Sequence, residues 1–170
     1  LSLFPNNDAF GIKINGIWEK ISVQEYNNNA RWFALGLLEM GFKKGDKIAT
    51  ITPNRPEWNY VDLGMAMLGV IHVPLYTSLS VNEYHYVLEH SDARMLIVSD
   101  NKLHCILKPV LKDLPNLEYV YTFNAASKGT CWMEVIEKGK SCSEEQQTRL
   151  DKIKSEIMES DCASLIYTSG

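Results

Sequence analysis

The feature that most restricts how this chain can fold is an alternation of short strand-like runs with helix-like segments. The strand-like runs cover residues 47–52, 70–76, 94–98 and 117–123, and a helical pattern fills each interval between them. Successive parallel strands need a crossover connection, and that connection is usually a helix. The alternation therefore predicts an α/β fold, in which helices flank a parallel sheet built from Rossmann-like βαβ units.

Local signals mark the starts of two of the predicted helices. Ser22 with Glu25, and Ser80 with Glu83, have capping-box spacing, in which the serine accepts a backbone N–H and the glutamate reaches back. A third helix, predicted over 57–68, is apolar on more than one face. Such a helix is expected to be largely buried.

An antiparallel pair of strands is expected ahead of the sheet. Residues 9–14 and 17–21 are strand-like, and Asn15-Gly16 between them is the strongest short signal for a two-residue hairpin turn. The helix that follows carries apolar residues at alternating steps of four and three, which is one face of an amphipathic helix. The chain is thus expected to begin with a hairpin over about residues 9–21.

The regular alternation weakens after the last predicted strand. A short helix is expected around 132–138 and an exposed, charge-rich helix over 143–158. We therefore divide the chain into an α/β subdomain over 1–123, an irregular and helical connector over 124–163, and a last strand with a turn over 164–170.

Composition points toward small molecules as partners. The net charge is −4, from 21 acidic and 17 basic residues, so neither a basic field for nucleic acid nor a polybasic membrane patch is present. With 45% hydrophobic residues, the chain can form a substantial core. The longest apolar run, 63–75, is too short and too interrupted for a transmembrane segment, so we expect a soluble, cytoplasmic protein.

Metal and nucleophile chemistry find little support in the sequence. The cysteines are widely spaced and form no ligand cluster, so neither a zinc site nor a disulfide framework is expected. The histidines form no i, i+4 pair and stand beside no serine or cysteine nucleophile, so we interpret them as ordinary core or surface residues. These residues are Cys105, Cys131, Cys142 and Cys162, and His72, His85, His90 and His104. No G-x-G-x-x-G motif and no paired carboxylates are evident either.

Residues 164–170 predict a short buried strand that opens into a turn of hydroxyl side chains and glycine. Thr168 and Ser169 offer hydroxyls, and Gly170 lacks the Cβ that would keep a backbone N–H away from an anion. This chemistry is that of the start of a phosphate-binding loop. Because Thr-Ser-Gly after a strand is also a common turn, the interpretation depends on the order of the segments before it.

Five stretches occur in an informative order along the chain. They are Trp18 to Ser22, Leu38 to Ala49, Asn54-Arg55-Pro56-Glu57-Trp58, Val73-Pro74-Leu75-Tyr76 and Ser164 to Gly170. Over nearly all 170 residues this order resembles the AMP-forming acyl-CoA synthetases, the adenylate-forming ligases. The third and fourth stretches look most like the long-chain fatty acid CoA ligase branch. Thr77, where that branch typically has proline, and Cys162, where it has a larger aliphatic residue, depart from it.

The resemblance implies a two-step reaction of a fatty acid with ATP and coenzyme A. The carboxylate would attack the α-phosphate of ATP to form an acyl-adenylate and pyrophosphate, and coenzyme A would then displace AMP. Such chemistry needs Mg²⁺, backbone amides, hydroxyls and a lysine. By the match, Thr168 would lie near the metal and the phosphates, Ser169 would offer its hydroxyl, and Gly170 would allow the close turn. No catalytic residue is assigned within the chain.

By the same resemblance, we expect the chain to be the N-terminal portion of such a ligase, inactive alone and without bound ATP. Apolar surface left uncovered predicts that it self-associates. The parent is expected in the cytoplasm, with peripheral attachment to a membrane left open. Two alternatives remain open: an adenylating enzyme for another carboxylic acid, and a non-catalytic α/β binding module.

Overall fold

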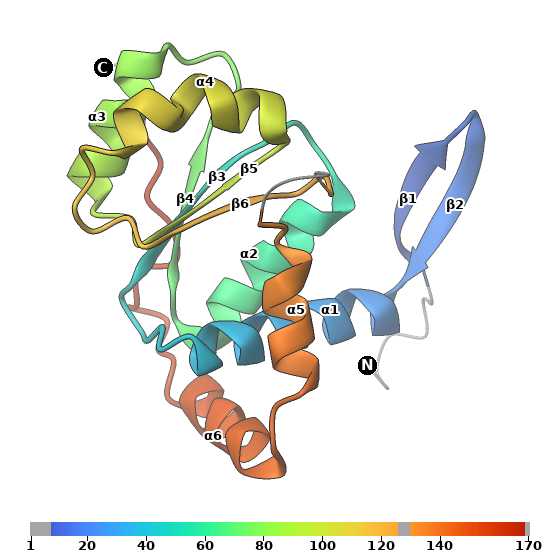
Figure 1. Ribbon diagram of the computed structural model, residues 1–170. Coiled ribbons are helices and arrows are strands. Elements are labelled where there is room, and N and C mark those ends of the chain that lie inside the picture. The colour runs from blue at the N-terminus through green and yellow to red at the C-terminus, as the bar shows by residue number, and fades with distance from the viewer. Residues whose placement is uncertain (1–7, 126–129, 169–170) are drawn as a thin grey trace.

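The computed structural model describes residues 8–125 and 130–168 and contains the predicted alternation of strands and helices (Figure 1). In chain order the elements are β1 (Asp8–Ile14), β2 (Ile17–Ser22), α1 (Val23–Glu39), β3 (Lys47–Ile51), α2 (Pro56–Leu68), β4 (Ile71–Leu75), α3 (Val81–Ser91), β5 (Met95–Val98), α4 (Asn101–Leu111), β6 (Tyr119–Thr122), α5 (Met133–Lys140) and α6 (Glu144–Ser155). Of the helices described, none is long and apolar enough to cross a bilayer.

The centre of the fold is a parallel sheet with strand order β4-β3-β5-β6. Side chains alternate between its two faces, so that Ile48 and Ile97 join one hydrophobic cluster and Ala49 and Leu96 join another. Helices α1, α2 and α5 lie on one side of the sheet, and α3 and α4 lie on the other (Figure 1). The predicted α/β fold, with helices flanking a parallel sheet, is confirmed.

Helix α1 contacts α2 and α5, and its contact with α5 brings the two backbones together. A Cβ added at Gly139 of α5 would overlap the carbonyl oxygen of Trp32 in α1, and a Cβ added at Gly36 would overlap that of Val135. Each helix therefore has a glycine at the point where the backbone of the other helix lies against it. The close approach lets Trp132 and its neighbours in α5 reach the core beneath α1.

Helix α6 is held against α1 by charge and by one buried side chain. The Arg31 guanidinium contacts both carboxylate oxygens of Asp151, with Nη1–Oδ1 at 2.5 Å and Nη2–Oδ2 at 2.9 Å. Hydrogen bonds from Arg31 lower the pKa of Asp151. Leu150 is fully buried beside this pair. The charge-rich helix predicted over 143–158 is confirmed, and it ends three residues earlier than expected.

The two predicted capping boxes differ. At α3 the box is complete, because Ser80 Oγ accepts the Glu83 N–H at 3.3 Å and the Glu83 carboxylate accepts the Ser80 N–H at 2.7 Å. At α1 only one half forms, in which Ser22 Oγ accepts the Glu25 N–H at 3.0 Å. The side chain of Glu25 instead lines a hollow between the hairpin and the helices.

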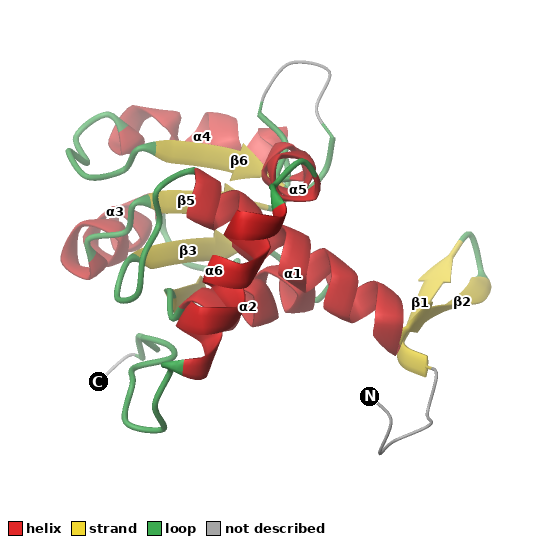
Figure 2. Cartoon of the chain, turned by 90° about the horizontal axis from the view of Figure 1, so that it is seen from below, coloured by secondary structure: helices red, strands yellow, loops and turns green. Residues whose placement is uncertain are grey.

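The predicted hairpin is present and extends away from the sheet (Figure 2). Its turn places Asn15 at φ 50° and Gly16 at φ 85°, the left-handed values that a tight two-residue hairpin needs. Phe10 anchors β1 to α1 through an edge-to-face contact with Tyr26. Beyond that anchor the tip is exposed, and Trp18 of β2 is 69% accessible.

One prediction about the end of the chain is wrong in part. A buried strand was expected from residue 164 onward, but in the described residues only Ser164 pairs with the sheet, as a single parallel bridge to His72. Ile166 is 60% exposed. The segment therefore meets β4 at a single position and does not continue as a ladder. Ser169 and Gly170 lie outside the described residues.

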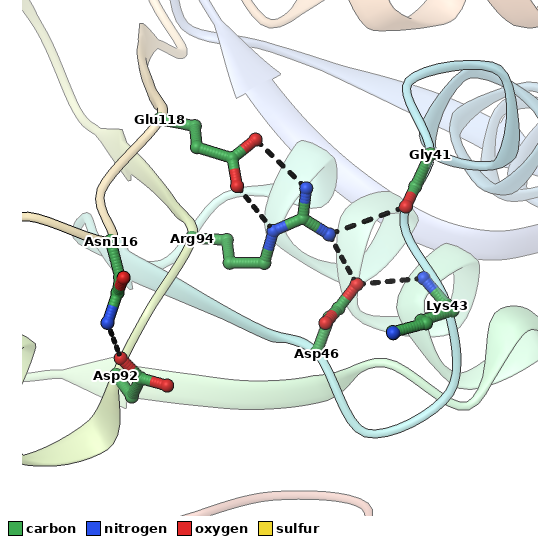
Figure 3. Close-up of polar contacts among 7 residues, drawn as sticks. All are labelled: Gly41, Lys43, Asp46, Asp92, Arg94, Asn116 and Glu118. Carbon is green, nitrogen blue, oxygen red and sulfur yellow. Dashed lines mark hydrogen bonds and ion pairs between the residues drawn. The ribbon is translucent and has the colours of Figure 1, made fainter.

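The amino edge of the sheet is fixed by an arginine between two carboxylates (Figure 3). Arg94 reaches Glu118 through Nε and Nη2 at 2.8 and 2.9 Å, and reaches Asp46 through Nη1 at 2.5 Å. Its guanidinium also lies 4.4 Å from the centre of the Phe42 ring. Asp46 in turn accepts the backbone N–H of Lys43. One side chain thus ties together the starts of β3, β5 and β6.

Replacing Gly139 by alanine should destabilise the fold, because the new methyl group would force α5 away from the Trp32 carbonyl. We expect a loss of about 2–3 kcal/mol, in the upper part of the range for overpacked sites. Gly11→Ala is the control, since its Cβ would meet Trp18 at an ordinary 3.5 Å. Urea denaturation followed by circular dichroism measures both variants. Equal stability of Gly139→Ala and the wild type would contradict the close packing of α1 on α5.

Glu118→Gln should make the protein less sensitive to acid. Hydrogen bonds from Arg94 lower the pKa of Glu118, so its contribution is present above the unfolded pKa of about 4.3 and is lost as the pH falls through the lower folded pKa. Because the Glu118 side chain is 44% exposed, the effect should stay below about 1 kcal/mol.

The measurement for this variant is the urea midpoint between about pH 7 and about pH 3. The decline toward low pH should be shallower in Glu118→Gln than in the wild type. Glu159→Gln is a matched control, because Glu159 is exposed and has no ion pair in the described part of the chain. Identical pH profiles for Glu118→Gln and the wild type would show that the Arg94 pair adds nothing.

Candidate functional site

The carboxyl ends of the parallel strands meet along one edge of the sheet, opposite to the arginine of Figure 3. In open α/β sheets this is the edge at which ligands bind. The residues that directly follow the strands there are Thr52, Tyr76, Ser99 and Phe123, and Thr168 follows the segment paired with β4. The structure thus brings the predicted phosphate-binding residue Thr168 to the edge where a ligand is expected.

The segment that leads to Thr168 is attached to the sheet through one residue. The His72 N–H donates to the Ala163 carbonyl at 3.0 Å, and the Leu165 N–H donates to the His72 carbonyl at 2.9 Å. Farther along, the Tyr167 hydroxyl lies 2.8 Å from Nδ1 of His90 in α3. Burial raises the pKa of Tyr167, which keeps this hydroxyl protonated. These contacts fix the direction in which the chain leaves the sheet.

Thr168 lies on the rim of a hollow with aromatic walls. The hollow measures about 410 Å³ and is lined by Tyr76, Leu79, Glu83, Tyr86, Val87, Tyr167 and Thr168. Tyrosine rings can stack on a planar or apolar group, and the Thr168 hydroxyl can hydrogen-bond to a polar one. The lining contains no cationic side chain, and Glu83 is acidic. Among the described residues, this hollow could therefore offer a phosphate group the Thr168 hydroxyl but no positive charge.

A second hollow, of about 340 Å³, lies where the chain passes from β3 into α2, and Arg55 is the one cationic side chain among the described residues that line it. The Arg55 guanidinium is already engaged: it holds Glu57 through two hydrogen bonds of 2.9 and 3.1 Å, and Asn124 through one of 3.0 Å. It also covers the Phe123 ring at 4.9 Å. Arg55 therefore joins two loops of the carboxyl edge.

Glu57 shows how strongly this arginine is engaged. Burial acts to raise the pKa of Glu57, but the hydrogen bonds from Arg55 and from its own backbone N–H outweigh burial, so the pKa is lowered. The carboxylate consequently stays ionised and keeps Arg55 bound. A free phosphate group would have to compete with this pair, so we assign Arg55 a role in holding the loops.

A polar network lies between the sheet and α2, next to the residue that binds the last segment. The Trp58 indole N–H donates to Thr50 Oγ1 at 3.1 Å, and Thr50 Oγ1 lies 2.8 Å from Nε2 of His72. Nδ1 of His72 lies 2.6 Å from Asp62 Oδ1. Since a carboxylate accepts, His72 donates to Asp62 through Nδ1–H, and in the neutral ring Nε2 accepts the Thr50 hydroxyl.

This acid, histidine and hydroxyl arrangement is not a nucleophilic triad. Thr50 is 1% exposed and His72 is 2% exposed, so a substrate cannot reach either. The Thr50 oxygen also already accepts the Trp58 indole N–H. The interpretation of His72 as a core histidine therefore stands, but its two partners were not foreseen. Two features of the sequence could have indicated these partners. They are the i, i+4 spacing of Trp58 and Asp62, and the polar residues Thr50 and His72 inside otherwise apolar strands.

The structure describes one of the three predicted phosphate-binding residues. Thr168 is exposed, whereas Ser169 and Gly170 lie outside the described residues, so the turn itself is not seen. Within residues 8–125 and 130–168, no group of three or more histidine, cysteine, aspartate or glutamate side chains could hold a metal ion. None of the four cysteines forms a disulfide.

Comparison with known proteins finds relatives that match the whole length of the chain. A family model described as AMP-binding enzyme matches residues 3–170. The chain is 32% identical over its whole length to the long-chain-fatty-acid–CoA ligase ACSBG1 of Rattus norvegicus, of which it covers 24%. It is 30% identical, over 92% of its length, to the long-chain-fatty-acid–CoA ligase FadD15 of Mycobacterium bovis, of which it covers 26%. The chain therefore spans about a quarter of the length of these relatives.

Solved structures share the fold. Coronafacic acid ligase from Pectobacterium brasiliense superposes with a TM-score of 0.73 and 22% identity, over 88% of this chain and 29% of that one. A long-chain-fatty-acid–CoA ligase, FadD1 of Archaeoglobus fulgidus, gives a TM-score of 0.71 and 21% identity, over 88% of this chain and 28% of that one. At these identities the likeness concerns the fold alone.

Proposed function

Because the chain belongs to the AMP-binding enzyme family, we propose that it is part of an ATP-dependent, AMP-forming long-chain fatty acid CoA ligase. The observation that supports this most is the match of the whole chain to long-chain-fatty-acid–CoA ligase ACSBG1. The position of Thr168 at the carboxyl edge of the sheet agrees with it. Because the relatives are about four times longer, the activity proposed is that of the longer protein.

The proposed reaction has two displacement steps. A carboxylate oxygen of the fatty acid attacks the α-phosphorus of ATP, an O–P bond forms, and pyrophosphate leaves with the electrons of the broken bond. The sulfur of coenzyme A, after losing its proton, then attacks the acyl carbonyl carbon, and AMP leaves as the C–S bond forms. Mg²⁺ would neutralise charge that gathers on the phosphate oxygens.

Within this reaction we assign Thr168 the role of a hydroxyl ligand to the phosphates or to the metal. Ser169 would add a second hydroxyl, and Gly170 would allow the close turn. Since the hollow beside Thr168 has no cationic lining, most of the charge of ATP would be balanced by residues outside the described part of the chain. We infer that residues 1–170 alone are inactive.

We also propose how residues 1–170 associate, how they divide into subdomains, and where the protein is located. Exposed apolar side chains, among them Ile17, Trp18, Tyr76 and Ile166, would be covered in the longer protein and would favour self-association of residues 1–170. We infer a division into an α/β subdomain over 1–123, a connector over 124–163 and a phosphate-loop segment over 164–170. The absence of disulfides among the four cysteines supports a cytoplasmic location.

A second candidate is a ligase for a different carboxylic acid. The fold is shared as closely with coronafacic acid ligase as with a fatty acid ligase, so the fold does not select the acid. A panel of long-chain, short-chain and aryl acids, tested on the longer protein by pyrophosphate release, separates the two. Release that requires long-chain acids supports the first proposal, and release with aryl acids alone supports the second.

Thr168→Val in the longer protein should lower kcat/KM for ATP by about 100-fold, because valine keeps the shape but removes the hydroxyl. Thr168→Ser is the matched control and should stay near the wild type. The measurement is acid-dependent pyrophosphate release. Equal rates for the valine and serine variants would remove Thr168 from the site, and no release with any acid of the panel would overturn the proposed function.

A further inference from the structure

The last described segment depends on His72 for its place beside the sheet. In the described residues, the backbone hydrogen bonds between this segment and the sheet are the two that His72 makes, to Ala163 and from Leu165. Thr168 follows Leu165 by three residues. The orientation of the His72 peptide groups, together with the contact of Tyr167 with His90, therefore sets the line along which the chain runs to Thr168.

The side chain of His72 is itself fixed by three contacts. Asp62 of α2 binds Nδ1 at 2.6 Å, and Thr50 of β3 lies 2.8 Å from Nε2. The Trp58 ring packs 5.0 Å away, centre to centre. An apolar side chain could fill the same volume, but it would not be held in one orientation by hydrogen bonds at both ends.

The network is also completely satisfied. Over the described residues no buried side-chain nitrogen or oxygen lacks a hydrogen-bond partner. Fully paired networks of this kind make a core rigid and select one arrangement, whereas removal of one partner leaves a buried polar atom unpaired. The loss of the Thr50 hydroxyl would leave Nε2 of His72 without its donor.

We propose that His72 is a positioning residue, which Asp62 and Thr50 orient so that the segment 163–168 presents Thr168 at the carboxyl edge. The effect of this positioning on ATP binding rests on the proposed function. His72 does not touch substrate, because it is 2% exposed, and acts through the backbone of the segment it binds. The geometric part of the proposal concerns residues 1–170 alone and is testable on that chain.

The test on residues 1–170 compares two isosteric changes. Thr50→Val removes the hydroxyl that faces His72, and Thr122→Val makes the same change at another buried threonine, 2% exposed, on β6. Amide hydrogen exchange followed by NMR should show Leu165 exchanging about tenfold faster in Thr50→Val than in Thr122→Val. Amides of β5 should be affected alike in both, and Thr50→Ser should restore slow exchange.

Asp62→Ala is the second variant, because Asp62 is half exposed and its loss leaves the core filled. It should also accelerate Leu165 selectively. In the NMR spectrum of the wild type, His72 should appear as the Nδ1–H tautomer, and this signature should weaken in Asp62→Ala. Leu165 exchange no faster in Thr50→Val and Asp62→Ala than in Thr122→Val would overturn the proposal.

The longer protein provides the test of the catalytic consequence. Thr50→Val should raise KM for ATP or lower kcat by about tenfold, and Thr50→Ser should restore it. Faster Leu165 exchange in a longer protein that releases no pyrophosphate would refute the proposed function and support the positioning role. Full activity of Thr50→Val alongside unchanged Leu165 exchange would refute the positioning role alone.

Discussion

The rest of the structure depends on covering both faces of a parallel sheet. Each strand pairs its backbone groups with its neighbours and presents apolar side chains to both sides, so two helical layers are required. On one side this layer is made tight by glycines: Gly36 and Gly139 let α1 and α5 touch, and Gly64 lets α2 approach the backbone of α1. Helix α6 and the hairpin then attach to α1, outside the sheet.

The two edges of the sheet are held by different interactions. At the amino edge, Arg94 binds two carboxylates and closes the starts of three strands (Figure 3). At the carboxyl edge, Arg55 joins two loops, and the segment 163–168 is held by His72 and His90. The exposed hydroxyl of Thr168 is therefore presented by a framework whose interior is fixed. A phosphate loop that begins there would start from a defined position.

Local features of the fold were readable from the sequence, and non-local ones were not. The hairpin turn at Asn15 and the cap at Ser80 are set by neighbours a few residues away, so their residue types predict them. The strand order, and hence the meeting of Thr50 with His72, depends on pairing across the sheet, which spacing alone does not reveal. The strand expected from residue 164 was predicted too long for the same reason, since its extent depends on a partner. The resemblance of the whole chain singled out Thr168, and the structure shows that this residue lies at the carboxyl edge of the sheet.

We propose that the segment ending at Thr168 begins an ATP phosphate loop at the carboxyl edge of this sheet. A crystal structure of the longer protein with ATP and Mg²⁺ tests it directly. We predict that the Thr168 hydroxyl lies about 3 Å from a phosphate oxygen or is a ligand of the metal. We also predict that Ala163 and Leu165 keep their backbone hydrogen bonds to His72 in that complex. A Thr168 hydroxyl separated from both the triphosphate and the metal by more than one bridging water would contradict the claim.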